Sequence, residues 1–127
     1  MCSRARAPDV RLQVQEDRGV VVLAPHGEVN FENTALVAAA IRDRLGPTPR
    51  IVLDLSRVPY MDSTSLGTVL DALRSVRELD GDLRLVGLAA NVRRVFDLMD
   101  GERLFRIYAT LEEGVSSFAP SEAPVAP

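Results

Sequence analysis

The hydrophobic positions change their rhythm repeatedly along the chain and predict strands alternating with helices. Residues 10–15 alternate strictly between apolar and polar side chains, as in a half-buried strand, and residues 20–25 form a more continuous apolar run. The turn-forming residues EDRG lie between these two segments, which predicts an antiparallel hairpin. Short apolar runs at 50–55, 83–88 and 104–108 predict three further strands.

Four other segments carry apolar residues three or four positions apart, the spacing of one face of an α-helix. The predicted helices span residues 32–45, 63–79 and 91–99, and a last one begins at Thr110, where Glu113 completes a capping-box pattern. The first three helices are expected to end at Gly46 with Pro47, at Asp80 with Gly81, and at Gly101, in that order. The expected inward side chains are Leu36, Val37, Ala40, Ile41 and Leu45; Leu66, Val69, Leu70, Leu73 and Val76; Val92, Val95, Phe96 and Met99; and Leu111, Val115 and Phe118.

The predicted order of elements is β-β-α-β-α-β-α-β-α. Alternation of this kind requires right-handed crossovers, so we expect an α/β fold with a mixed, mostly parallel sheet of about five strands and four helices. Functional residues of such sheets gather beyond the carboxyl ends of the strands. The loop at 26–33 and the loop that contains Asp62, Ser63 and Thr64 both follow such ends, and we expect them to be neighbours.

The composition limits the classes of protein that the chain can belong to. Its 127 residues suffice for one domain, and no apolar run approaches the roughly 18–20 residues that a membrane span needs. The formal charge of −3 does not indicate nucleic-acid binding, and all 15 basic residues are arginines. Cys2 is the only cysteine, and metal-ligand spacing is absent. We therefore expect a cytoplasmic protein with no cofactor, no metal, no membrane contact and no direct nucleic-acid contact.

Proline, alanine and small polar residues dominate both ends of the chain. Residues 1–8 and 119–127 lack apolar periodicity, and we predict that both segments are disordered. The folded domain is therefore expected to span residues 9–118.

Three hydroxyl residues follow an aspartate at the start of the second predicted helix, in the run Asp62-Ser63-Thr64-Ser65. Asp62 or Ser63 can serve simply as the N-cap, because a side-chain oxygen there accepts from unpaired amides of the first turn. A second interpretation is a modification site, since a phosphate on Ser63 would meet the positive end of the helix dipole. The local pattern is compatible with both interpretations.

Enzymatic interpretations find less support in the sequence. A serine hydrolase would need a Gly-x-Ser-x-Gly elbow, and the only histidine available as a base is His26. A phosphoreceiver at Asp54 would need paired acids and a lysine, and the chain has no lysine. Asp54 is more simply expected to bond the loop that follows it. Glycine-rich nucleotide-binding motifs are absent from the sequence as well.

The segment IVLDLSRVPYMDSTSLGTVL resembles the central part of STAS domains, specifically those of bacterial anti-sigma factor antagonists. The stretches VLAPHGEVNFENTALVAAAI and NVRRVFDLMDGERLFRIYATLEEGV resemble the flanking parts of the same family. The resemblance implies a regulator of transcription, including stress responses, that is not an enzyme. It implies binding to an anti-sigma factor with serine kinase activity, which frees a sigma factor. The kinase would phosphorylate Ser63 to end the binding, and a serine phosphatase would restore it.

Two positions depart from the pattern of the resembled family. Ser65 stands where a glycine is frequent, and Asn30 stands where an aspartate is frequent in the loop after the second strand. A STAS module that is not phosphorylated, in a signalling scaffold or a transport-associated complex, is the alternative. We expect a monomer that meets its partner through the two loops and the outer face of the second helix. The expected contact residues are Asn30, Asp62, Ser63, Thr64, Ser65, Thr68, Asp71 and Arg74.

Overall fold

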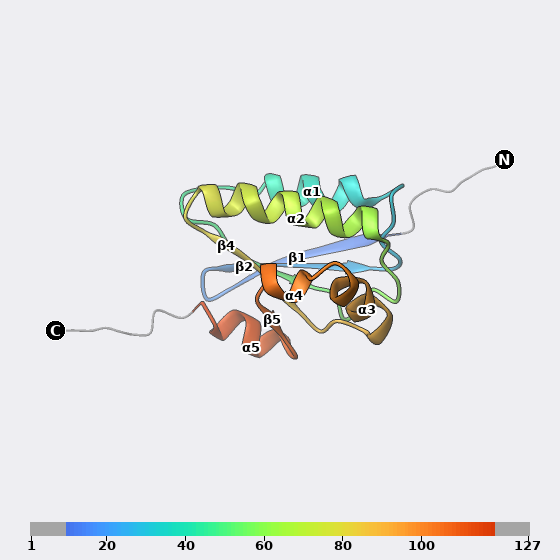
Figure 1. Cartoon of the computed structure of the whole chain (residues 1–127). Helices are drawn as coiled ribbons and strands as arrows, with labels where there is room; N and C mark the ends of the chain where they lie inside the picture. Colours follow the sequence, from blue (N-terminus) through green and yellow to red (C-terminus); the bar gives the residue numbers. More distant parts are fainter. Residues whose placement is uncertain (1–9, 119–127) are drawn as a thin grey trace.

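A five-stranded sheet with helices on both faces organises residues 10–118, the part of the chain that the computed structural model describes (Figure 1). The predictions of disorder for 1–8 and 119–127 lie outside these residues. The strands lie across the sheet in chain order, as β1 (Arg11–Asp17), β2 (Val20–His26), β3 (Arg50–Asp54), β4 (Asp82–Val86) and β5 (Ile107–Tyr108). β1 runs antiparallel to β2, and every other neighbouring pair is parallel. The predicted mixed, mostly parallel sheet is confirmed.

The predicted hairpin between the first two strands is also present. Arg18 and Gly19 form its two-residue turn with φ angles of 53° and 80°. Positive φ at both positions is typical of the type I′ turn, whose twist matches that of the flanking strands.

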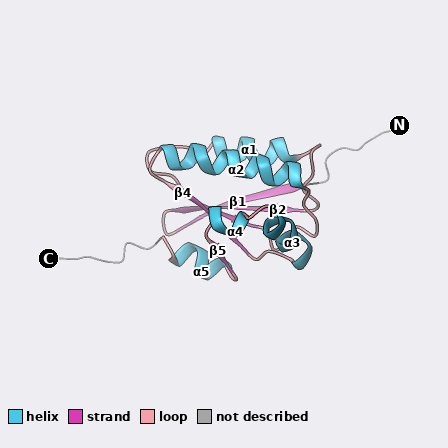
Figure 2. Cartoon of the chain, in the orientation of Figure 1, coloured by secondary structure: helices cyan, strands magenta, loops and turns pink. Residues whose placement is uncertain are grey.

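All helices but the last connect successive parallel strands, and the helices cover the two faces of the sheet (Figure 2). They are α1 (Thr34–Arg42), α2 (Ser63–Glu78), α3 (Ala90–Leu98), α4 (Gly101–Leu104) and α5 (Leu111–Ser116). α1 and α2 lie side by side on one face, and α5 lies on the opposite face (Figure 1). The capping box predicted at Thr110 and Glu113 is formed, with both reciprocal hydrogen bonds present.

Alternating residues of the strands build a separate core on each face. Ile51 and Leu53 of β3 belong to the larger core, which α1, α2 and α3 cover. Val52 belongs to the smaller core beneath Val115 of α5. α5 approaches the sheet closely at Gly114, where a Cβ atom would lie 2.3 Å from Cγ1 of Val86. Glycine is therefore required at this contact.

Two side chains predicted to face inward are exposed instead. α1 is shorter than the predicted 32–45, and its buried stripe is formed by Thr34, Val37, Ala38 and Ile41. Leu36 lies about 100° around the helix from Val37, outside this stripe, and is 49% exposed. Met99 follows the last residue of α3 with non-helical backbone angles and is 44% exposed.

The segment after α3 differs most from the prediction. Asp100 adopts a left-handed conformation with φ 56°, which turns the chain, and Gly101 begins the additional short helix α4 rather than only ending α3. Phe105 then packs against Phe96 with ring centroids 5.7 Å apart. This anchoring leaves only Ile107 and Tyr108 of the predicted strand 104–108 to pair with the sheet as β5.

Candidate functional site at the head of helix α2

The loop after β2 and the segment before α2 lie side by side, as predicted. Val29 and Met61 form a parallel β-bridge. The Val29 amide donates to the Tyr60 carbonyl at 3.0 Å, and the Gly27 amide donates to the Arg57 carbonyl at the same distance. These backbone hydrogen bonds extend the β2–β3 contact beyond the sheet and hold the two loops against each other.

Asp62 is the N-cap of α2 and also joins the helix to the neighbouring loop. Its Oδ1 accepts from the Ser65 amide at 2.8 Å and from the Ser65 hydroxyl at 2.7 Å. Its Oδ2 accepts from the Phe31 amide at 3.0 Å. The simple capping role predicted from the sequence is therefore confirmed for Asp62, and one carboxylate connects two loops as well.

The hydrogen bonds at Asp62 determine its protonation. Partial burial acts to raise the pKa of this carboxyl group, but the Ser65 hydroxyl, the Ser65 amide and the Phe31 amide all favour the ionised form. The donors prevail, so the pKa of Asp62 lies below its ordinary value. Asp62 therefore carries a negative charge at the head of α2 at neutral pH.

We expect the Asp62→Asn variant to lose about 1–2 kcal/mol of unfolding free energy at pH 7, because one amide oxygen replaces a carboxylate that serves three donors. Urea denaturation measures this loss. A carboxyl group whose pKa is lowered by folding stabilises the fold above its unfolded pKa of about 3.9 and loses this effect as the pH falls through the folded value. The difference between the two proteins should therefore shrink below about pH 4.

Asp71→Asn is the matched control, since it removes an exposed carboxylate from the same helix. Its effect should stay within about 0.5 kcal/mol at either pH. A loss for Asp62→Asn that is the same at pH 3 as at pH 7 would exclude the charge as its cause.

The three hydroxyl residues differ in exposure. Ser63 and Thr64 are exposed in the first turn of α2. Ser65 is 0% exposed, and its hydroxyl is committed to Asp62. Ser65, which stands where the resembled family often has glycine, thus supports the cap of α2 from inside the domain. Its buried side chain is therefore not available for contact with a partner, contrary to the prediction.

Asparagines shape the loop that faces the helix head. Asn30 Oδ1 accepts from the Glu32 amide at 2.9 Å, and its Nδ2 donates to Glu28 at 3.3 Å. Asn33 is buried; its Oδ1 accepts from the Asn30 amide and its Nδ2 donates to the Glu28 carbonyl. Asn33 was not predicted, although an Asn-x-x-Asn spacing in a loop favours such side chain–backbone bonds.

The remaining predicted contact residues follow the outer side of α2. Thr68 donates its hydroxyl to the Thr64 carbonyl at 3.2 Å. Asp71 and Arg74 are exposed and lie 3.5 Å apart as an ion pair. All three therefore lie off the buried stripe, as their spacing predicted.

Two exposed aromatic side chains near the helix head were not predicted from the sequence. Phe31 is 69% exposed and Tyr60 is 46% exposed. Phe31 is bonded to Asp62 through its backbone, and Tyr60 precedes the segment that leads into α2. An aromatic residue between polar loop residues, as in NFEN, is the signal that could have identified Phe31.

The residues of the enzymatic interpretations have other partners. Asp54 Oδ1 accepts from the Ser56 amide at 3.0 Å, as expected for a loop-bonding aspartate. His26 Nε2 lies 2.7 Å from Gln13 Oε1 on the neighbouring strand. Within residues 10–118, no group of three or more His, Cys, Asp or Glu side chains could hold a metal ion. In the same range, no helix has the length and apolarity to cross a membrane.

The sequential five-stranded mixed sheet and the exposed, capped head of α2 define a class of small α/β domains. The family model described as STAS domain matches residues 11–114. The chain belongs to this family.

Several relatives of the chain carry the name anti-sigma factor antagonist. A candidate anti-sigma factor antagonist of Thermotoga neapolitana is 35% identical over 98 residues, which cover 76% of this chain and 87% of that protein. The anti-sigma-B factor antagonist of Bacillus subtilis is 27% identical and covers 84% of this chain and 98% of its own length. The structure of the antagonist SpoIIAA in its unphosphorylated form is 26% identical, has a TM-score of 0.66 and covers 84% of this chain and 95% of its own.

Proposed function

We propose that the protein is a cytoplasmic anti-sigma factor antagonist that binds an anti-sigma factor with serine kinase activity and thereby releases a sigma factor. Phosphorylation of Ser63 ends the binding, and a serine phosphatase restores it. The protein is in this proposal a ligand and a substrate rather than a catalyst. The family membership and the names of the relatives support the partner class.

The geometry of the three hydroxyls is the observation that carries the proposal. Ser63 is exposed at the first position of α2, directly after the ionised Asp62. The amides of Ser63 and Thr64 have no hydrogen-bond partner among residues 10–118, so a phosphate on Ser63 could accept from them. The hydroxyl of Ser65 is buried and already bonded. A kinase could thus reach Ser63 without opening the fold.

A contact surface for the partner surrounds Ser63. We include Asn30 and Phe31 from the loop after β2, together with the exposed side of α2. Phe31 offers an aromatic anchor of the kind that dominates protein interfaces. Asp62 supplies a charge beside Ser63, and the exposed residues further along α2 extend the surface. The full set is Asn30, Phe31, Tyr60, Asp62, Ser63, Thr64, Thr68, Asp71 and Arg74.

The test is to capture the partner with the full chain from cells of the native organism and to map any phosphate by mass spectrometry. We expect a kinase-type anti-sigma factor to be captured, and we expect that kinase with ATP to modify Ser63. Ser63→Ala should bind the same partner and resist ATP-dependent release, while Thr64→Ala should be modified and released normally. Phosphate found on Thr64 alone would show that the regulatory phosphorylation site is Thr64 rather than Ser63. Tight binding in the presence of ATP with no phosphate would instead indicate a STAS module that is not phosphorylated.

A further inference from the structure

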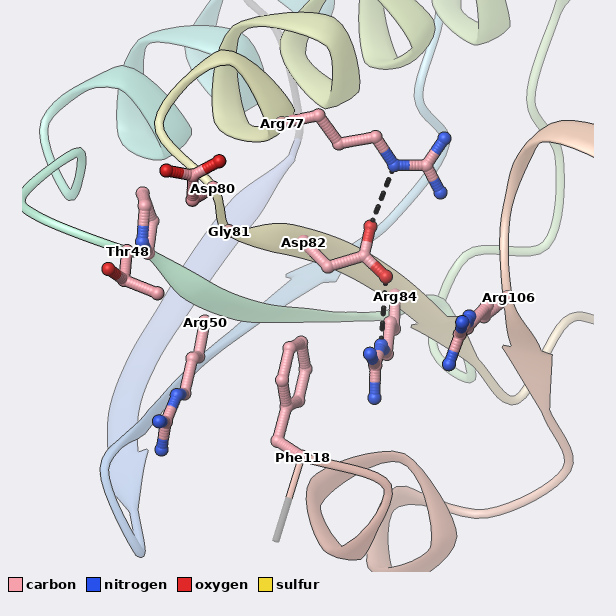
Figure 3. Close-up of a pocket in the computed structure, with 10 residues that line it drawn as sticks. Thr48, Arg50, Arg77, Asp80, Gly81, Asp82, Arg84, Arg106 and Phe118 are labelled. Atoms are coloured by element: carbon pink, nitrogen blue, oxygen red, sulfur yellow. Dashed lines mark hydrogen bonds and ion pairs between the residues drawn. The ribbon is translucent and has the colours of Figure 1, made fainter. Parts of the chain in front are cut away.

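A polar hollow lined by several arginines lies at the opposite end of the parallel strands from Ser63. Its volume is about 450 Å³, within the range typical of small-molecule sites. Arg50 is the first residue of β3, Arg84 is the middle residue of β4, and Arg106 directly precedes β5. Arg77 comes from the end of α2. Figure 3 shows the guanidinium groups of Arg50, Arg84 and Arg106 extending to the same side of the sheet.

Arg84 is held rigidly at the centre of this hollow. Its side chain is 12% exposed, and its Nε donates to Asp82 at 2.9 Å. One terminal nitrogen, Nη1, donates to the carbonyl and the hydroxyl of Ser117 at 2.7 and 2.8 Å, and the guanidinium lies 3.9 Å from the ring centroid of Phe118. The other terminal nitrogen, Nη2, has no hydrogen-bond partner among residues 10–118. A fixed guanidinium with unused donors is suited to bind an oxyanion.

The charges of the hollow do not cancel. Asp82 accepts from both Arg77 and Arg84 and also from the Leu83 amide, so both of its carboxylate oxygens are already bonded within the domain. Arg50 and Arg106 are exposed and form no ion pair with any described residue. The lining residues include four arginines and two aspartates, Asp80 and Asp82, so their charges sum to +2 (4 − 2) on a chain whose formal charge is −3.

We propose that this hollow binds the phosphate group of a small phosphorylated molecule, a site separate from the partner-binding surface around Ser63. A phosphate dianion matches the excess of two positive charges and can accept from several guanidinium groups at once. Arg50 and Arg106 supply the unpaired charges, and Arg84 supplies a preformed donor between them. The volume leaves room for the rest of a molecule the size of a nucleotide beside Pro49 and Phe118.

The test is a titration of the full chain, at constant ionic strength, with inorganic phosphate, AMP and uncharged adenosine. Backbone amide and arginine side-chain NMR signals report the site, and calorimetry reports the affinity. We expect phosphate and AMP to shift the signals of Arg50 and Arg106, and adenosine to leave them unchanged. Arg50→Gln and Arg106→Gln should each weaken AMP binding about fivefold, the effect of one charge-assisted hydrogen bond at a partly exposed site.

Arg94→Gln is the matched control, because Arg94 is an exposed arginine on α3 outside the hollow. It should bind AMP as the unchanged protein does. Three outcomes would overturn the proposal: no response to millimolar phosphate, equal binding of adenosine and AMP, or shifts confined to residues 63–65. Equal weakening by Arg94→Gln would also overturn it, since it would show only a general response to charge.

Discussion

Replacing Ser63 by aspartate is expected to weaken binding to the anti-sigma factor about a hundredfold, which corresponds to about 3 kcal/mol. Ser63 lies at the centre of the proposed contact surface, and Asp62 already carries one negative charge at the adjacent position. A docked partner would remove water from both carboxylates, and neighbouring like charges in a desolvated interface oppose association. Isothermal titration calorimetry with the captured partner measures the change.

Ser63→Asn is the matched control for this experiment, because asparagine has nearly the size of aspartate but no charge. It should bind within a few-fold of the unchanged protein. The fold itself should tolerate both variants, since an acidic residue in the first turn of a helix is stabilising by about 0.3–1 kcal/mol. If asparagine and aspartate weaken binding equally, bulk rather than charge would control the interface.

Replacing Phe96 by alanine should lower the free energy of unfolding by about 3–5 kcal/mol. Phe96 is 0% exposed in α3, packs edge-on against Phe105 and lies against Gly101. Its removal would leave a cavity beneath the turn formed by α3 and α4, which the short elements around it can fill only in part. Urea denaturation followed by circular dichroism measures the loss.

Leu98→Ala is the control within the same helix. Leu98 is 80% exposed, so its truncation removes little buried apolar surface and should change stability by less than about 0.5 kcal/mol. Similar losses for the two variants would mean that the buried packing of Phe96 does not account for its result, because both variants introduce alanine and so do not lower helix propensity.

Local signals in the sequence predicted the elements whose ends are set by nearby residues. α2 was predicted from Ser63 to Leu79 and spans Ser63–Glu78, because its cap and its long apolar stripe both lie in the segment itself. The hairpin turn at Arg18 and Gly19 has the same local origin. α4 was not predicted because a glycine such as Gly101 is typical of a helix end. The course of the chain after α3 depends instead on the left-handed conformation of Asp100 and on the packing of Phe105 against Phe96.

Most residues of the candidate site were predicted from the sequence, but the hydrogen bonds that join them were not. The spacing of Ser65 with Val69, Ala72 and Val76 is that of a buried helix face, and this signal could have shown that Ser65 faces inward. The bond between Asp62 and the Phe31 amide could not be predicted, since it joins residues 31 positions apart. Such a contact depends on how the two loops meet once the sheet has formed.

The sequential order of the strands has a consequence for synthesis on the ribosome. Each strand of the sheet pairs with the strand that precedes it in the chain, so no strand waits for a partner made much later. The sheet can therefore grow from β1 to β5 as the chain emerges, and short waiting times limit the exposure of unpaired strand edges. The head of α2, which follows β3, would meet the already made loop after β2 before β4, α3 and the rest of the domain are complete.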